Sequence, residues 1–175
     1  HWECNYDGAD CGGGFYAYRS GFTLRNCIIN DNIASRNEGT GGGVYFAYTS
    51  APSTIENTRI ISKSAPGSFG TGGGLYGIRV NHPLTIAQCT FQDNEAQKLC
   101  GGAALAFNIE DLVTIVDTDF LSNTAVSDLA GGLFVRLSEN GEILRMDRVR
   151  FQNNQALNRA GALYLDVAGA VTPNA

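Results

Sequence analysis

The sequence is poor in charged residues and in the residue types that cover helical surfaces. Only 17% of its 175 residues are charged, and it contains one Met and two His. The 12 Lys and Arg residues are spread thinly against 17 Asp and Glu, which gives a net charge of −5. Such sparse positive charge cannot neutralise the phosphates of a nucleic acid. We therefore expect no nucleic-acid partner.

Long hydrophobic runs are also missing. No stretch reaches about 18 consecutive apolar residues, the length that a membrane-spanning helix needs. We therefore expect no membrane span. The sequence does not start with Met, which indicates a processed mature chain or an excised fragment. Its length suits a single domain.

Cysteine is present in an odd number, five, so at least one thiol has no partner within the chain. Cys4 and Cys11 flank a turn-rich stretch and lie close enough in sequence to form a disulfide. Such a bridge would imply an oxidising compartment. We therefore expect the protein outside the cell or on the cell surface.

Glycine is abundant, with 22 residues, and much of it lies in a repeated motif. A glycine-rich entry into an apolar strand occurs at 12–15, 41–44 and 72–75, and variants of it recur at 101–104, 130–133 and 160–163. Measured between the last residues of these motifs, the spacings are 29, 31, 29, 29 and 30. A regular period of this size indicates a repeat architecture.

A second motif has the same period and begins at an apolar residue. Its first position is held by Leu24, Ile55, Ile86, Ile115 and Met146, with spacings of 31, 31, 29 and 31. Five residues further lie Ile29, Ile60, Phe91, Phe120 and Phe151. Eight residues further lie Asn32, Lys63, Asn94, Asn123 and Asn154. Ten residues further lie five alanines, at 34, 65, 96, 125 and 156.

The local chemistry of the repeat favours strands over helices. The segments are rich in β-branched and aromatic residues, alternate with period two, and are separated by Gly and Asn. We predict an all-β fold, a right-handed single-stranded parallel β-helix of five to six coils of about 30 residues, in which equivalent residues stack. The predicted organisation is an N-terminal cap or lead-in at 1–11, the β-helix at 12–167, and a C-terminal tail or incomplete coil at 168–175.

A shorter series marks a predicted bend between two strands. Asn26, Asn57 and Gln88 hold equivalent positions, and Asn tolerates the left-handed backbone angles that a repeated bend requires. In the last two coils this position holds Asp117 and Arg148. We predict that these two side chains stack as an opposite-charge pair.

The alternation of the glycine-rich entry with Phe-x-x-Asn resembles the passenger repeats of bacterial polymorphic outer-membrane proteins. The Phe-x-x-Asn motifs start at Phe91, Phe120 and Phe151. More broadly, the chain is similar to the pectate-lyase-like β-helix superfamily. The resemblance covers residues 12–167 and departs from the pattern at Ile29 and, further, at Lys63. It implies a fold, whereas proteins with this fold range from lyases and hydrolases to adhesins and scaffolds.

The resemblance would imply lyase or hydrolase signatures, and the sequence contains none that we recognise. The Asn-Thr-Asp strand and the Gly-His-Gly turn of galacturonase-like members are absent, as is a motif matching the acidic calcium cluster of lyases. His82 precedes a proline and is interpreted as a solvated turn residue. Asp31 and Asp93 hold equivalent positions two coils apart, about 10 Å, beyond the range of paired glycosidase carboxylates. We predict no catalytic residues.

Metal and cofactor sites are not expected either. Asp7 and Asp10 have a spacing that resembles a calcium loop, but the distal ligands of such a loop are missing. A structural turn held by Cys4 and Cys11 explains this stretch better. Cys27 and Cys89 are expected two coils apart, about 9–10 Å, which is too far for a disulfide.

Aromatic residues follow the inward position of each glycine-rich entry. If Phe15, Val44, Leu75, Ala104, Leu133 and Leu163 point inward, the residues after them point outward. These outward residues are Tyr16, Tyr45, Tyr76, Leu105, Phe134 and Tyr164. Tyr18, Ile78 and Phe107 widen this stripe. A contiguous apolar face usually marks a binding or assembly surface, although the N-terminal segment can also fold over it.

Two functions fit these features. The first is an extracellular structural protein, a β-helical subunit or passenger segment that self-associates into a fibre or adhesive stalk through open ends and the aromatic face. The alternative is a β-helix that binds or degrades polysaccharides, with the tyrosine stripe as a sugar platform. A rank of threonines resembles an ice-binding surface, but it is a single file that ends at Arg145.

Overall fold

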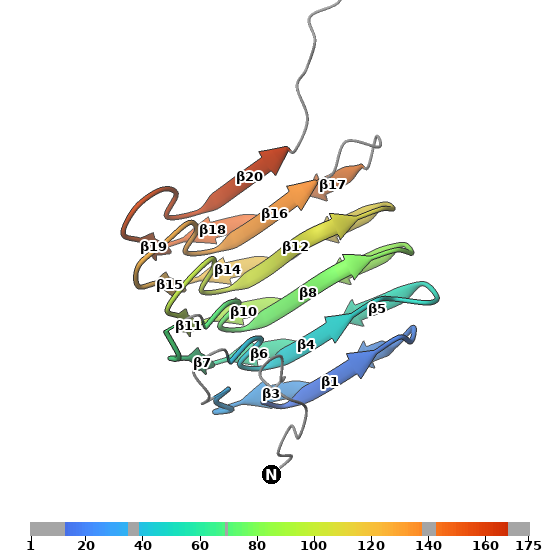
Figure 1. Ribbon diagram of the computed structural model, residues 1–175, viewed down its shortest axis with the longest axis horizontal. Coiled ribbons are helices and arrows are strands. Elements are labelled where there is room, and N and C mark those ends of the chain that lie inside the picture. Colours follow the sequence, from blue (N-terminus) through green and yellow to red (C-terminus); the bar gives the residue numbers. More distant parts are fainter. Residues whose placement is uncertain (1–12, 35–38, 69, 138–142, 168–175) are drawn as a thin grey trace, which may run out of the picture.

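The protein is a parallel β-solenoid of about five turns, each of about 31 residues, as Figure 1 shows. The computed structural model describes residues 13–34, 39–68, 70–137 and 143–167. Every pairing between named strands of this part is parallel, and the part contains no helix. The prediction of an all-β solenoid is therefore confirmed.

Four sheets run the length of the solenoid, and each coil contributes one strand to most of them. Sheet A contains β1 (Phe15–Tyr18), β4 (Val44–Ala47), β8 (Leu75–Val80), β12 (Ala103–Ile109), β16 (Leu133–Leu137) and β20 (Leu163–Val167). Sheet B contains β2 (Thr23–Arg25), β5 (Ser53–Glu56), β9 (Leu84–Ala87), β13 (Val113–Val116) and β17 (Leu144–Asp147). Sheet C contains β3 (Ile28–Asn30), β6 (Arg59–Ile61), β10 (Thr90–Gln92), β14 (Asp119–Leu121) and β18 (Arg150–Gln152). Sheet D contains β7 (Ser64–Ala65), β11 (Glu95–Ala96), β15 (Thr124–Ala125) and β19 (Gln155–Ala156).

The register of the sheets follows the sequence repeat. Leu24, Ile55, Ile86, Ile115 and Met146 pair in one continuous series through sheet B. In sheet C the series runs through Ile29, Ile60, Phe91, Phe120 and Phe151. Equivalent residues of consecutive coils therefore stack, as the repeat spacing predicts.

The core lies inside the solenoid and is filled by these stacked series. Ile55, Ile86, Ile115, Phe91 and Phe120 are completely buried. Along β5, β9 and β13 buried and half-buried residues alternate, because successive side chains of a strand point to opposite faces. Each coil can bury its inner face only against its neighbours, so stability is shared along the stack.

Two sheet A strands, β4 and β8, follow a turn whose backbone geometry requires glycine. Gly41 and Gly72 have φ angles of 59° and 61°, in the left-handed region that favours glycine. A Cβ on Gly41 would lie 2.2 Å from the Val44 carbonyl oxygen, and one on Gly72 would lie 2.3 Å from that of Leu75. The chain therefore needs glycine to turn into β4 and β8.

One part of the predicted register is wrong. The fourth glycine-rich entry was expected to place Ala104 inside and Leu105 outside, but Ala103 pairs with Leu75 and Leu133. Ala104 consequently faces outward, and Leu105 is completely buried in the core. The two adjacent alanines leave open, from the sequence, which of them takes the inward position. Gly101 and Gly102 align with the two positions directly before the inward residue in the other entries.

The predicted cap at 1–11 and tail at 168–175 lie outside the described residues, as does residue 12 of the predicted solenoid. Within the described part, no helix has the length and hydrophobicity needed to cross a membrane.

Candidate interaction face

The outer face of sheet A carries the predicted aromatic stripe. Equivalent positions of its six strands hold Tyr16, Tyr45, Tyr76, Ala104, Phe134 and Tyr164. We call this series the outer file. It contains five of the six residues predicted for the interaction face, with Ala104 in place of Leu105.

Aromatic rings of the outer file stack where they occupy consecutive coils. The ring centroids of Tyr16 and Tyr45 are 5.3 Å apart and the rings are almost parallel, at 9°. Those of Tyr45 and Tyr76 are 6.0 Å apart, and those of Phe134 and Tyr164 are 5.8 Å apart. Ala104 separates the two groups. Contacts of this kind stabilise neighbouring strands in addition to the burial of their surface.

The middle of the outer file is not open to solvent. Tyr45 and Tyr76 are 2% and 6% exposed, and Phe134 is completely buried. They belong to a second hydrophobic cluster, separate from the interior core. Its other members are Ala47, Cys100, Ala104, Ala106 and Ala130, with Leu99 and Leu129 packed against it.

The sequence contains a signal for this second cluster that the repeat analysis missed. The loops before β12 and β16 each carry an apolar pair directly before the two glycines, Leu99-Cys100 and Leu129-Ala130. Cys100 and Ala130 also pair as a parallel bridge. These loop residues belong to the same cluster as Tyr45 and Tyr76. Because both tyrosines are almost completely buried, they cannot present open rings to a sugar.

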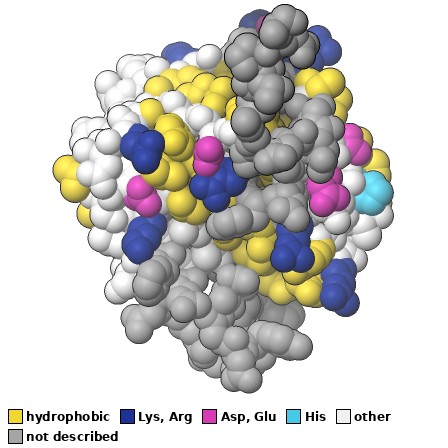
Figure 2. Space-filling view, turned by 45° about the horizontal axis from the view of Figure 1, so that its top comes forward, with side chains coloured by type: hydrophobic (Ala, Val, Ile, Leu, Met, Phe, Trp, Pro, Cys, Tyr) yellow, Lys and Arg dark blue, Asp and Glu magenta, His cyan; other side chains and the backbone are white. Residues whose placement is uncertain are grey.

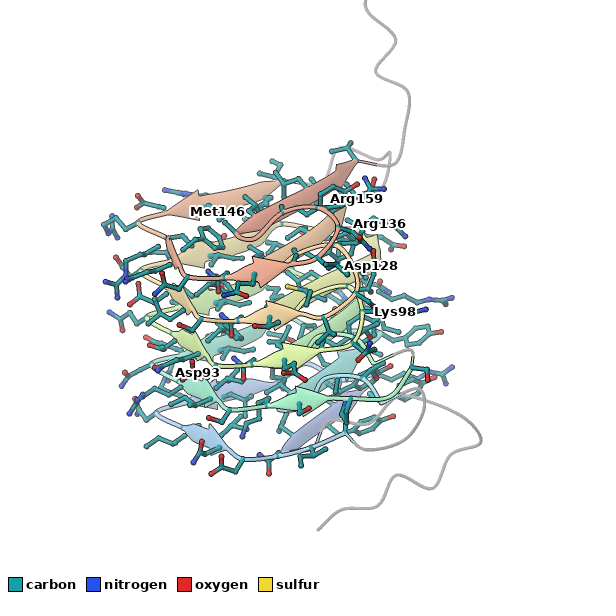
Figure 3. The ribbon with its side chains drawn as sticks, turned by 90° about the vertical axis from the view of Figure 1, so that its left-hand side faces the viewer. Asp93, Lys98, Asp128, Arg136, Met146 and Arg159 are labelled. Carbon is teal, nitrogen blue, oxygen red and sulfur yellow. The ribbon has the colours of Figure 1, made fainter. Side chains whose placement is uncertain are left out.

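Exposure of the aromatic stripe is concentrated at the first coil. Tyr16 is 48% exposed and Tyr18 is 44% exposed. At the last coil Tyr164 is half-buried, and Arg159 Nη1 donates a hydrogen bond to its Oη over 2.9 Å. Arg136 forms an ion pair with Asp166 at 2.7 Å. Figure 3 shows Arg136 and Arg159 near each other on one side of the solenoid.

A ladder of asparagines stabilises an interior corner between sheets C and D. Asn94 Nδ2 donates to Asn123 Oδ1 over 2.8 Å, and Asn123 Nδ2 donates to Asn154 Oδ1 over 2.9 Å. Each amide also donates to a backbone carbonyl of the preceding coil, Ile60, Phe91 or Phe120. Buried amides that satisfy one another in this way fix the register of the coils.

Lys63 occupies the same position one coil earlier and breaks the ladder. Its side chain is buried, at 1% exposure, and its Nζ has no hydrogen-bond partner. Burial lowers the pKa of Lys63 to about 8, while the charge of Asp31 acts in the opposite direction. An unpaired ammonium in this position costs free energy, because desolvation disfavours the charged form.

The predicted bend series is confirmed. Asn26, Asn57, Gln88, Asp117 and Arg148 all have positive φ angles, between 45° and 57°. Asn57 Nδ2 donates to Asn26 Oδ1 over 2.8 Å. Arg148 forms the predicted ion pair with Asp117, and its hydrogen bond lowers the pKa of that carboxyl.

Two other carboxylates considered from the sequence, Asp31 and Asp93, lie in exposed bends. Asp31 and Asp93 both have a φ of 53° and accept hydrogen bonds from the adjacent Asn30 and Gln92 side chains. Figure 3 shows Asp93 on the opposite side of the solenoid from Lys98 and Arg159. Among the described residues, no three His, Cys, Asp or Glu side chains are grouped closely enough to hold a metal ion.

The cysteines of the described part are free thiols. Cys27, Cys89 and Cys100 form no disulfide, in agreement with the expectation for Cys27 and Cys89. Burial raises the pKa of Cys89 to about 11 and that of Cys100 to about 12. Both therefore stay protonated and unreactive at neutral pH. Cys4 and Cys11, like Asp7 and Asp10, lie outside the described residues.

No family model matches this chain, and no curated protein or solved structure matches it either.

Proposed function

We propose that this chain is a structural β-solenoid that associates end to end with a second copy, as the extracellular subunit or passenger segment of a fibre or adhesive stalk. The supporting observation is the exposed inner side of the last described coil. Leu165 and Val167 in β20 are 46% and 58% exposed, whereas Val135, which pairs with Leu165, is completely buried. Apolar side chains and strand edges of this kind form a template for another strand.

The two ends of the described stack carry compatible residues. Phe15 begins the interior series of sheet A, and Leu163 ends it. The alanine positions of sheet D hold small residues in every coil, from Ala65 to Ala156. The series that begins with Arg25 ends with Asp147, so stacking in register would bring opposite charges together. A further coil of the same type therefore fits on β20 better than an unrelated surface does.

Sedimentation velocity over a range of concentrations tests the proposal. The expected result is a series of species that grows with concentration, and Leu165→Arg should abolish it. Val126→Lys is a suitable control, because Val126 is 39% exposed on a middle coil. A chain that stays monomeric at all concentrations, or that responds equally to both variants, would contradict the proposal.

The extracellular location is part of the proposal, and its support is the disulfide expected between Cys4 and Cys11. Mass spectrometry of the unreduced chain is the direct test, since a bridge between them removes two hydrogens.

The same proposal includes kinship with the passenger repeats of polymorphic outer-membrane proteins. Its support is the Phe-x-x-Asn motif, which here builds the asparagine ladder and the stacked phenylalanines.

A further inference from the structure

The asparagine ladder has a direction along the solenoid. Asn94 and Asn123 each donate a backbone N–H and a side-chain N–H to the Oδ1 atom of the asparagine in the next coil. The Lys63 backbone N–H likewise donates to Asn94 Oδ1 over 3.1 Å. Each Oδ1 atom therefore accepts hydrogen bonds from the coil before it, and each asparagine donates to the coil after it.

The last asparagine of the ladder has donors that no ladder acceptor meets. Asn154 Nδ2 donates to the Phe120 carbonyl over 2.8 Å, which uses one of its two hydrogens. No residue that the structure describes accepts the other hydrogen or the backbone N–H of Asn154. Asn154 is half-buried and directly follows β18, an edge strand of sheet C, by two residues. The C-terminal end of the ladder therefore carries two unused donors.

The first coil has the matching acceptor. Asn32 holds the equivalent position there, and its backbone carbonyl accepts the Ser64 N–H from the second coil. Within the described residues, no donor reaches Asn32 Oδ1. Asn32 is also half-buried and follows β3, the opposite edge strand of sheet C. The two ends of the stack are therefore complementary in hydrogen bonding.

We infer that the asparagine ladder continues through the junction between two copies, so that Asn154 of one copy donates to Asn32 of the next. Such a junction depends on the proposed end-to-end association, to which the ladder adds a register and a direction. In this register Asn32 Nδ2 meets the carbonyl of Phe151, as Asn94 Nδ2 meets that of Ile60. The two contacting surfaces differ, so the contact is heterologous and leads to a filament unless its rotation closes a ring.

The aromatic rings of the outer file continue in the same register. Tyr164 of one copy would lie next to Tyr16 of the following copy. Rings in consecutive coils of the outer file have centroids 5.3 to 6.0 Å apart, so the junction offers one more stack of this kind. Figure 2, which tilts the β20 end of Figure 1 towards the viewer, shows hydrophobic side chains beside acidic and basic ones. Such a mixed surface is typical of a protein–protein interface.

Other ways of joining the ends leave the asparagines unpaired. A slip of one residue would place Asn154 beside Ile33, whose exposed side chain has no acceptor. A two-fold contact between two C-terminal ends would bring donors against donors. Half-buried donors without acceptors cost free energy, so the head-to-tail junction in ladder register is favoured over both.

Disulfide cross-linking of the full chain measures the register directly. Ile33 and Gln155 belong to the same outward series of sheet D, in the first and last coils, and both are exposed. Within one chain they are four coils apart, about 19 Å, which is too far for a disulfide. At the proposed junction they are neighbours about 4.8 Å apart, which is within the range of one. The double variant Ile33→Cys with Gln155→Cys should therefore form covalent polymers in a glutathione redox buffer, detected on a non-reducing gel.

A second double variant is the matched control for the cross-link. Ile33→Cys with Gln152→Cys also places two exposed thiols at the two ends, but three residues out of register. It should form few covalent polymers. The parent chain is oxidised in parallel, because its own five cysteines set the background.

Sedimentation velocity on an asparagine variant tests the hydrogen bonds of the junction. Asn32→Ala should raise the dissociation constant of association at least about tenfold, because it leaves the donors of Asn154 unpaired. Its melting temperature, measured in dilute monomeric protein, should stay near that of the parent chain. Asn30→Ala is the control, since Asn30 is an exposed, outward residue of the same coil. It should change the dissociation constant by less than about threefold.

The outcomes separate this junction from association as such. If the parent chain associates but the two double variants cross-link equally, or neither cross-links above the parent background, the ladder register is wrong and end-to-end association stands. Equal effects of Asn32→Ala and Asn30→Ala would also overturn the junction. A parent chain that stays monomeric at every concentration would overturn the proposed function, and the junction with it.

Discussion

The same interior corner is built in two ways in the two halves of the molecule. In the third to fifth coils, Phe91, Phe120 and Phe151 stack with centroid distances of 4.9 Å and 5.1 Å, beside the asparagine ladder. In the first two coils the equivalent positions hold Ile29 and Ile60, and Lys63 occupies the ladder position of the second. The solenoid thus tolerates the unpaired, buried Lys63 in its second coil, because adjacent coils and the other sheets maintain the register.

The ladder is expected to respond most strongly to a change at its centre. Asn123 donates to Phe91 and Asn154 and accepts two hydrogen bonds from Asn94. Asn123→Ala would leave several buried polar groups unpaired and should lower the free energy of unfolding by about 3–4 kcal/mol. Urea denaturation at pH 7 measures this change.

A neighbouring exposed residue supplies the control for that variant. Gln152 lies on the outer face of β18, so Gln152→Ala should change the free energy of unfolding by less than about 0.5 kcal/mol. Equal effects of the two substitutions would show that the ladder does not contribute to stability.

Extending the ladder should stabilise the N-terminal half. Lys63→Asn replaces an unpaired buried amine by an amide that can donate to a backbone carbonyl of the preceding coil. The expected gain at pH 7 is about 2 kcal/mol in the free energy of unfolding. Lys63→Met, which removes the charge but adds no hydrogen bonds, should gain less. A loss of stability in both variants would mean that the ammonium group has a favourable role.

The difference between the native chain and Lys63→Asn should depend on pH. The folded pKa of Lys63, about 8, is below the value of about 10.4 expected in the unfolded chain. Between these values the unfolded state binds the proton and the folded state does not, so stability rises with pH. The stability gap between the two proteins should therefore be nearly constant below pH 7 and close by pH 10.5, because the difference between the folded and unfolded pKa corresponds to about 3 kcal/mol.

The smallest effect is expected on the outside of the solenoid. Arg148→Gln removes the ion pair with Asp117, but both residues are exposed and solvent screens their interaction. Urea denaturation at low and high salt should show little change in either condition. A large loss at low salt would indicate that the bend series supports the register as the asparagine ladder does.

The sequence alone was sufficient to predict the solenoid, the four stacked series and the bend positions. The period of the repeat and the residue types at each position determine these features, because residues at equivalent positions recur at the same spacing and stack in consecutive coils. Leu105 was placed on the wrong face because Ala103 and Ala104 fit the glycine-rich motif equally well. One residue of slip inverts every later side chain of that strand.

The candidate sites were harder to predict, since they depend on packing between segments of different coils. Tyr45 and Phe134 are buried in a cluster that also contains loop residues such as Leu99 and Leu129, which no strand pattern includes.

Every coil begins at an equivalent position of the repeat, and this determines how such a chain can change in length. Loss or gain of one whole coil, for example about 30 residues between equivalent glycines, brings together two surfaces that already match in shape and hydrogen bonding. The molecule can therefore be shortened or extended in whole units by recombination between repeats. A deletion of half a coil would join mismatched levels and leave no continuous sheet.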